Sequence, residues 1–345
     1  RVTPTGEDVY SERQIVITFN RPVVPIGQME RDKKAIPVTI TPEVDCEWRW
    51  INTSSLACQL TNKSKLELST RYDITVAPGI KAEDGQTIKE DYKATFITQR
   101  ANVEYAWFRT WKSPGTPVIR LTFNQPVTKT SARKSLSLVY GEKKTAVMLK
   151  PDPDYDEKPS YVPFGKGWLF FGDQEKRKSD EQLTEKDGEE ARRVWLLEPL
   201  AELPLDTNVT LKLAPGLISA MGPEPSVATK DVVAFDTYPE LSVLGVRCVT
   251  NDGVEVLFAP GESKADKCNP MATISLSFSA PVQRSQVKKN FEFSPAIGTA
   301  EQQNEIWGDL SEEYSRLNSA HTKGRGYDVY LPYGLKAAST YTVTL

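Results

Sequence analysis

Histidine is almost absent from this sequence, which has His321 as its single copy among 345 residues. A serine or cysteine nucleophile needs a base, and the tract NSAHTKGRG gives His321 no acidic or apolar neighbour along the chain to tune it. The sequence motifs of serine hydrolases, nucleotide-binding loops, dinucleotide folds and zinc proteases are missing as well. We therefore expect no enzymatic activity, no cofactor and no metal site in these residues.

Long apolar runs and an excess of one charge are also missing. No apolar run approaches the roughly 18 residues of a membrane-spanning helix, so we expect no membrane span. The chain has 43 basic and 46 acidic residues, and its net charge of −3 lacks the basic excess of a nucleic-acid-binding protein. We therefore expect no nucleic acid as a partner.

What the sequence does contain is one stretch that occurs three times. Ile15–Val23 (IVITFNRPV) returns as Val118–Val127 (VIRLTFNQPV) and as Ile274–Val282 (ISLSFSAPV). In each copy alternate residues are apolar, and the copy ends in a Pro-Val step. This pattern predicts a half-buried strand that ends at a turn.

A second marker follows the first one each time. Leu66–Gly79, Leu203–Gly216 and Leu335–Leu345 align without a gap, and the same face of the predicted strand is apolar in all three. Two markers in the same order indicate three homologous units, which is compatible with a chain too long for one hydrophobic core. We predict a first unit at 1–99, a second at 100–237 and a third at 238–345.

The pattern of short strands predicts the fold class. The first unit contains about seven short alternating segments, and Leu66 and Tyr72 have the spacing of sandwich domains in which a tyrosine hydroxyl caps a corner. Tyr341 repeats this spacing, whereas the second unit has Val209 there. We predict an all-β protein of three tandem immunoglobulin-like β-sandwich domains. The linkers of about two to five residues favour stacked units over freely swinging ones.

A tryptophan-rich hairpin is predicted in the first unit, from CEWRWI (46–51) and SLACQL (55–60). Its strands could place Cys46 opposite Cys58. Trp48 and Trp50 share a face by the period of two, which we interpret as core packing. An aromatic platform for a ligand is the alternative.

The four cysteines form two local pairs, Cys46 with Cys58 and Cys248 with Cys268, each inside one unit. We predict two disulfides, with buried free thiols as the alternative. The sequence has no C-x-x-C motif that would indicate a metal site. Disulfides indicate an oxidising compartment, secreted or periplasmic. The chain begins at Arg1 without an initiator methionine or signal peptide, so we expect any export signal to have been removed or left out.

The second unit carries a charged insert at about 151–193. Aspartates at 152, 154 and 156 resemble the start of a calcium loop, but prolines interrupt it and the required glycine and glutamate are missing. A solvated, mobile surface loop is the favoured interpretation, cut first by proteases between Asp173 and Glu190. At most we expect a short exposed helix from Ser179 to Ala191.

The third unit stops at Leu345, one position before the Ala-Pro-Gly that follows the other copies. Its last strand is therefore expected to be missing. We expect this C-terminally truncated unit to belong to the front part of a longer protein.

Both markers resemble the immunoglobulin-like modules at the front of bacterial alpha-2-macroglobulins. The resemblance is carried by F-N-[RQ]-P-V and by L-x-x-x-T-x-Y-x-[IV]-x-V-A-P-G, and it extends over the whole chain. The first hundred residues are most similar to the branch of that family without a reactive thioester. The family's Cys-Leu-Glu-Gln thioester motif is absent, and Cys58-Gln59-Leu60 is not a version of it.

The resemblance implies a function. Members of this family are large periplasmic proteins that resemble eukaryotic protease inhibitors, are cleaved at a bait region and then entrap the protease. It implies macroglobulin-type sandwiches with a non-catalytic scaffold role, whose partners are downstream macroglobulin domains and, for the full-length protein, proteases. The alternatives are an adhesin or envelope-binding array, and a secreted hydrolase with accessory modules.

Overall fold

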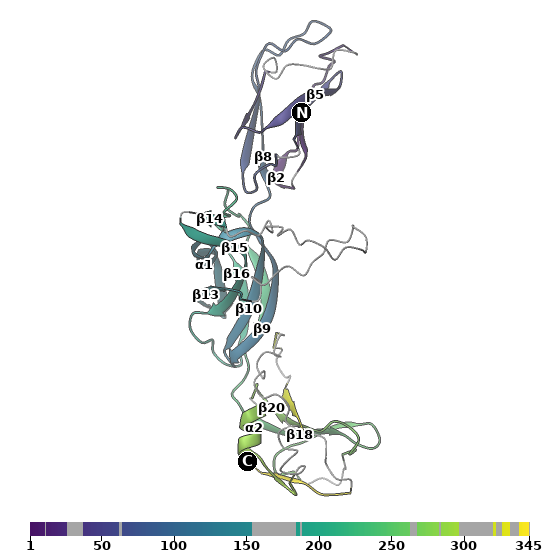
Figure 1. Ribbon diagram of the computed structural model, residues 1–345, viewed down its shortest axis with the longest axis vertical. Coiled ribbons are helices and arrows are strands. Elements are labelled where there is room, and N and C mark those ends of the chain that lie inside the picture. The colour runs from purple at the N-terminus through teal and green to yellow at the C-terminus, as the bar shows by residue number, and fades with distance from the viewer. Residues whose placement is uncertain are drawn as a thin grey trace, which may run out of the picture.

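A computed structural model describes residues 1–10, 12–25, 37–61, 64–153, 184–186, 188–262, 268–282, 284–296, 320–321, 326–331 and 338–344. Figure 1 shows three groups of strands that follow one another along the long axis of the molecule. In the described ranges almost every regular element is a strand, and the two helices have seven residues each. The prediction of tandem immunoglobulin-like β-sandwiches is confirmed as a fold class.

The first unit contains two sheets of four strands. In one the order is β1–β3–β6–β5, and in the other it is β2–β8–β7–β4, with β2 parallel to β8 and the remaining pairs antiparallel. Alternate residues of β3 and β7, such as Ile15, Ile17 and Ile74, are buried between the sheets because side chains alternate along a strand. The strands are β1 (Val2–Thr3), β2 (Gly6–Val9), β3 (Gln14–Thr18), β4 (Val38–Thr41), β5 (Cys46–Asn52), β6 (Ser55–Leu60), β7 (Arg71–Val76) and β8 (Tyr92–Thr98).

Among the described residues, the second unit has the largest core, with Trp111 and Phe123 fully buried. One sheet has the order β13–β15–β10–β9, with β14 also paired to β15, and the other has the order β12–β11–β16–β17. The elements are β9 (Val103–Ser113), β10 (Thr116–Thr128), α1 (Lys129–Ser135), β11 (Leu136–Tyr140), β12 (Lys143–Thr145), β13 (Val147–Pro151), β14 (Thr184–Lys186), β15 (Glu189–Pro199), β16 (Asn208–Leu213) and β17 (Lys230–Asp236).

The third unit is smaller in its described part, with a core around Leu276, Phe278, Val287 and Val329. Its sheets have the orders β19–β18–β20–β22 and β21–β23. The elements are β18 (Val243–Val249), β19 (Glu255–Phe258), β20 (Ser275–Phe278), α2 (Arg284–Asn290), β21 (Glu292–Ser294), β22 (Tyr327–Tyr330) and β23 (Thr342–Thr344). Each of the six sheets formed by the described strands takes its strands from one predicted unit. The unit boundaries themselves stay predictions.

The threefold repeat is visible in the backbone as well as in the sequence. Ser69, Asp206 and Ala338, each three residues after the first leucine of the second marker, all have a left-handed backbone, with φ of 49°, 49° and 54°. In the first unit the hydroxyl of Tyr72 accepts a hydrogen bond from the N–H of Glu67 at 2.8 Å, which is the predicted corner. The matching corner of Tyr341 involves residues 332–337, which lie outside the described residues.

The repeated strands depart from the prediction in one copy. The strands β3 and β20 end before the Pro-Val step, as expected, but β10 continues through Pro126 and Val127 to Thr128. The reason is tertiary pairing: Val127 and Thr128 lie opposite Arg192 and Ala191 of β15 after a register shift. A proline is tolerated there because the shift leaves its position outside the regular ladder.

The tryptophan hairpin forms as predicted, but its cysteines do not face each other. Cys46 lies opposite Leu60, and Cys58 lies opposite Trp48, so the disulfide is diagonal, with Cα atoms 5.3 Å apart. Cys248 and Cys268 form the second disulfide. Trp50 is buried against Val24, Leu56 and the ring of Phe19, which favours core packing over a ligand platform.

The insert differs from the prediction where it is described. Residues 154–183, which include most of the expected mobile segment, lie outside the described residues. The helix expected between Ser179 and Ala191 is wrong at its end, because β14 and the start of β15 pair as antiparallel strands, with Thr184 opposite Ala191. β15 begins at Glu189 instead of Arg193 because it pairs with both β14 and β10.

Candidate functional site: the junctions between units

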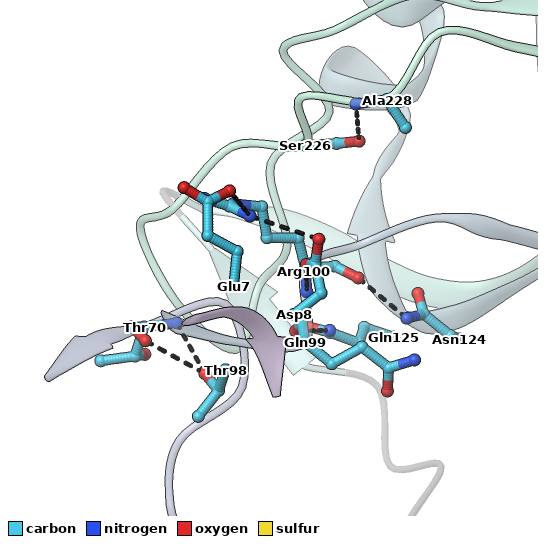
Figure 2. Close-up of polar contacts among 10 residues, drawn as sticks. All are labelled: Glu7, Asp8, Thr70, Thr98, Gln99, Arg100, Asn124, Gln125, Ser226 and Ala228. Carbon is cyan, nitrogen blue, oxygen red and sulfur yellow. Dashed lines mark hydrogen bonds and ion pairs between the residues drawn. The ribbon is translucent and has the colours of Figure 1, made fainter. Parts of the chain in front are cut away.

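Buried polar side chains gather where the first unit meets the second (Figure 2). Gln125 of β10 is 1% exposed and bridges two segments of the first unit. Its side-chain oxygen accepts a hydrogen bond from the hydroxyl of Ser69 at 2.9 Å, and its side-chain nitrogen donates to the carbonyl of Gln99 at 2.5 Å. Because these groups are buried, losing a partner would leave a desolvated polar atom unpaired, which is costly.

A loop of the second unit meets the same corner of the first by its backbone. The N–H of Glu224 donates to the carbonyl of Ser69 at 2.8 Å, and its carboxylate accepts from Nε of Arg71 at 3.0 Å. A Cβ atom on Gly222 would lie 2.1 Å from the carbonyl oxygen of Leu68 and 2.4 Å from that of Ser69. Only glycine allows so close an approach of two backbones.

The linker contributes a buried cation. Arg100 is 5% exposed, and its guanidinium donates to Glu7 at 3.0 Å and to Asp8 at 3.3 Å, both in β2. Its backbone N–H donates to Asp8 as well, at 2.9 Å. A buried charge is retained only where it is paired, so these contacts hold the linker against the first unit.

The residue after the signature phenylalanine holds the linker from the other side. In the second unit the side-chain oxygen of Asn124 accepts from the N–H of Asn102 at 2.7 Å, and its side-chain nitrogen donates to the carbonyl of Arg100 at 2.9 Å. Its backbone N–H donates to the carbonyl of Asn102 at 3.1 Å. We call these three contacts the linker clamp.

Ser279 forms the same clamp in the third unit. Its hydroxyl accepts from the N–H of Ser242 at 2.7 Å and donates to the carbonyl of Glu240 at 2.6 Å. Its backbone N–H donates to the carbonyl of Ser242 at 3.0 Å. Sequence reasoning used this position only as part of a repeat and missed its role, although the small polar residue between Phe and Pro-Val was a visible signal.

Each linker is also anchored at its start, by a threonine that is the last residue of β8 in the first unit and directly follows β17 in the second. The hydroxyl of Thr98 accepts from the N–H of Thr70 at 2.9 Å and donates to the carbonyl of Glu67 at 2.7 Å. Thr237 repeats this, accepting from the N–H of Thr207 at 2.9 Å and donating to the carbonyl of Pro204 at 2.6 Å. Linkers fixed at both ends leave little freedom for the units to swing.

The second junction is aromatic. The ring of His321 stacks on Tyr238 with centroids 4.0 Å apart, and Tyr238 meets Trp111 edge-on at 4.8 Å. The carbonyl of His321 accepts from the N–H of Asp236 at 3.0 Å. The lone histidine, which has no tuning neighbour in the sequence, therefore gains several through the fold.

Burial sets the electrostatics of this junction. Desolvation lowers the pKa of His321, although the negative charges of Asp236 and Asp206 oppose the shift. Desolvation also raises the pKa of Tyr238 to about 12. Both rings are therefore neutral near pH 7, which suits a stacked pair away from water.

The predicted site residues lie elsewhere. Cys46, Cys58, Cys248 and Cys268 form disulfides inside units and take no part in the junction contacts described above. Over the described residues, no group of three or more His, Cys, Asp or Glu side chains is placed to hold a metal ion. None of the helices described is long and apolar enough to cross a membrane.

Comparison with known proteins finds a family match within the first unit. Residues 2–98 match the model of the family described as the bacterial Ig-like domain. No curated protein matches the chain. Bacterial Ig-like domains and disulfides are compatible with an extracellular or exported protein.

Proposed function

We propose that this chain is a non-catalytic spacer of an exported protein, in which linked Ig-like units are held in fixed orientations. The observation that carries the proposal is the first junction, where a buried glutamine, a buried arginine and a backbone contact at Gly222 join two units. Such contacts depend on one relative orientation, because a swing of a few ångströms would leave buried polar groups unpaired.

The specific setting that we propose is the front of a periplasmic protease trap of the alpha-2-macroglobulin type. It is supported by the resemblance of both repeated markers and by the two disulfides, which suit an oxidising compartment. In that setting downstream macroglobulin domains bind the chain's far end, and proteases are targets of the full-length protein. The present residues supply spacing and no trap chemistry.

Fixed orientation is tested by the distance between spin labels on exposed positions of the first two units, Lys93 in β8 and Lys143 in β12. We expect a narrow distance distribution in the natural chain and a broad one in Gly222→Ala. Val227→Ala, an exposed change in the same loop, is the matched control and should leave the distribution narrow. A broad distribution in the natural chain would refute the rigid spacer.

The protease-trap setting is tested by pairing the isolated chain with the full-length protein against a general protease. The isolated chain should neither hydrolyse a substrate nor slow the protease, whereas the full-length protein should entrap it. Inhibition by the isolated chain at stoichiometric amounts would contradict the spacer role and direct attention to the insert at 151–193.

A second candidate function, an envelope-binding array, is favoured by one observation. Tyr105 and Trp107, two residues apart on β9, are 56% and 64% exposed, and exposed aromatic faces stack on sugar rings. Binding of the isolated chain to purified cell-wall polysaccharide, with loss of binding in Trp107→Ala, would favour this function over the protease trap.

A further inference from the structure

The linker clamp is repeated together with its strand register. The carbonyls of Asn102 and Ser242 accept from the backbone N–H groups of Asn124 and Ser279, and their own N–H groups donate to the side-chain oxygens of the same two residues. One step further, Phe123 pairs with Val103 and Phe278 pairs with Val243. In both units the next pairing skips one residue, because Thr122 pairs with Tyr105 and Ser277 pairs with Gly245.

The first unit has the same position in its own signature strand. Asn20 follows Phe19 as Asn124 follows Phe123, and it is exposed. Within the described part of the chain, neither the side-chain amide nor the backbone of Asn20 has a hydrogen-bond partner. The side chain of Asn20 thus carries the same acceptor oxygen and donor nitrogen as that of Asn124. In Asn124 both of these groups are hydrogen-bonded to the linker.

The N-terminal end of β1 already lies on the edge of β3 that leads to Asn20. Val2 of β1 pairs with Ile17 of β3, and Thr3 pairs with Val16, in the antiparallel sense. The N-terminal nitrogen of Arg1 donates to the carbonyl of Thr18 at 2.8 Å, and the N–H of Thr18 donates to the carbonyl of Arg1 at 2.8 Å. Arg1 therefore corresponds to Tyr105 of the second unit, because each lies opposite the residue before the signature phenylalanine.

We propose that Asn20 is a third linker clamp, a binding site for an extended polypeptide that enters the first unit as a continuation of β1. The ligand is recognised by backbone groups, one N–H and two carbonyls, so its side chains matter little. By the spacing of the second unit, the residue three positions before Arg1 would lie opposite Asn20, because Asn102 precedes Tyr105 by three. The carbonyl five positions before Arg1 would accept from the amide, as that of Arg100 does.

Continuity with an existing pairing identifies this occupant. A free peptide would have to order itself entirely on binding, whereas a segment joined to Arg1 is already aligned by the β1–β3 pairing. The clamp stands whether or not the chain serves a protease trap, since it depends only on the geometry of the three signature strands.

The test supplies the chain with its own linker. The sequence of residues 99–104, QRANVE, is fused before Arg1, and backbone amide hydrogen exchange is measured in the extension. We expect the backbone amide of the fused asparagine to exchange about tenfold more slowly in the extended chain than in a free peptide of that sequence. Asn20→Ala should abolish this protection, and Asn20→Ser should keep it, because Ser279 forms the clamp with a hydroxyl.

Two results would overturn the proposal. Exchange in the extension at the rate of the free peptide would show that nothing binds there. Protection that persists in Asn20→Ala would show that pairing with β3 alone holds the segment. The same Asn20→Ala change in the unextended chain should leave its thermal unfolding unchanged, which separates loss of the clamp from loss of the fold.

Discussion

The two junctions share the linker clamp and the threonine anchor at the start of the linker, and they differ in the contacts around these two features. At the first, Gln125, Arg100 and the loop at Gly222 make hydrogen bonds and ion pairs with the first unit. At the second, His321 stacks on Tyr238, which packs on Trp111. The common part fixes the path of the chain, while the surrounding loops decide how each pair of units is held and which conditions loosen it.

Removing the aromatic centre should affect the second junction most. Tyr238→Ala deletes a buried ring that contacts Trp111 and His321 and should lower the free energy of unfolding by about 3 kcal/mol. Chemical denaturation followed by tryptophan fluorescence measures the loss. Tyr105→Ala, a change at an exposed ring, is the matched control and should cost far less. Equal losses would show that the Tyr238 stack contributes little.

Breaking the polar bridge should affect only the first junction. Gln125→Ala leaves the buried hydroxyl of Ser69 without its acceptor and removes one of the two hydrogen bonds that the carbonyl of Gln99 accepts, which should cost about 2 kcal/mol. Limited proteolysis near residues 99–102 should speed up, while cleavage near residues 238–242 stays at its original rate.

Asn124→Ser, which imitates Ser279, should be tolerated better than Asn124→Ala.

Acid should distinguish the junctions. Because burial lowers the pKa of His321 in the docked state, the undocked state binds the proton more readily. Docking of the third unit is therefore at full strength above the ordinary histidine pKa of about 6.5 and weakens as the pH falls below it. Spin-label distances across the second junction, measured from pH 8 to pH 5, should broaden on acidification.

The control for acidification is His321→Phe, which keeps an aromatic ring on Tyr238 but cannot titrate. Its distances should stay constant over the range in which the natural chain broadens. His321 is the chain's single histidine, so no other imidazole contributes. Identical pH profiles for the two chains would assign the effect to carboxylates and contradict this prediction.

The smallest effect is expected at the rim of the first junction. Arg71 and Glu224 form an ion pair with side chains 49% and 20% exposed. Water and salt screen such a pair, so Arg71→Gln should cost about 0.5 kcal/mol or less. A denaturation midpoint that shifts as much as in Gln125→Ala would mean that the exposed rim, and not the buried bridge, holds the first junction.

Much of each unit could be predicted from local patterns. Period-two alternation identified β3, β10 and β20, and the L-x-x-x-T-x-Y spacing identified the Tyr72 corner. Strand ends were predicted less well, because β10 and β15 pair with each other beyond the ends that their local sequence patterns indicate. The diagonal geometry of Cys46 and Cys58 also depends on a register that hairpin length alone did not reveal.

The sequence by itself determined the repeat, the strand faces and the cysteine pairs, because each depends on spacing within a short stretch of chain. Only the tertiary structure decided the junctions. Ser69 meets Gln125 and Tyr238 meets His321 across 56 and 83 positions respectively, counted as 125 − 69 and 321 − 238. Periodicity describes which face of a strand is buried, but it contains no information about which loops of neighbouring units come into contact.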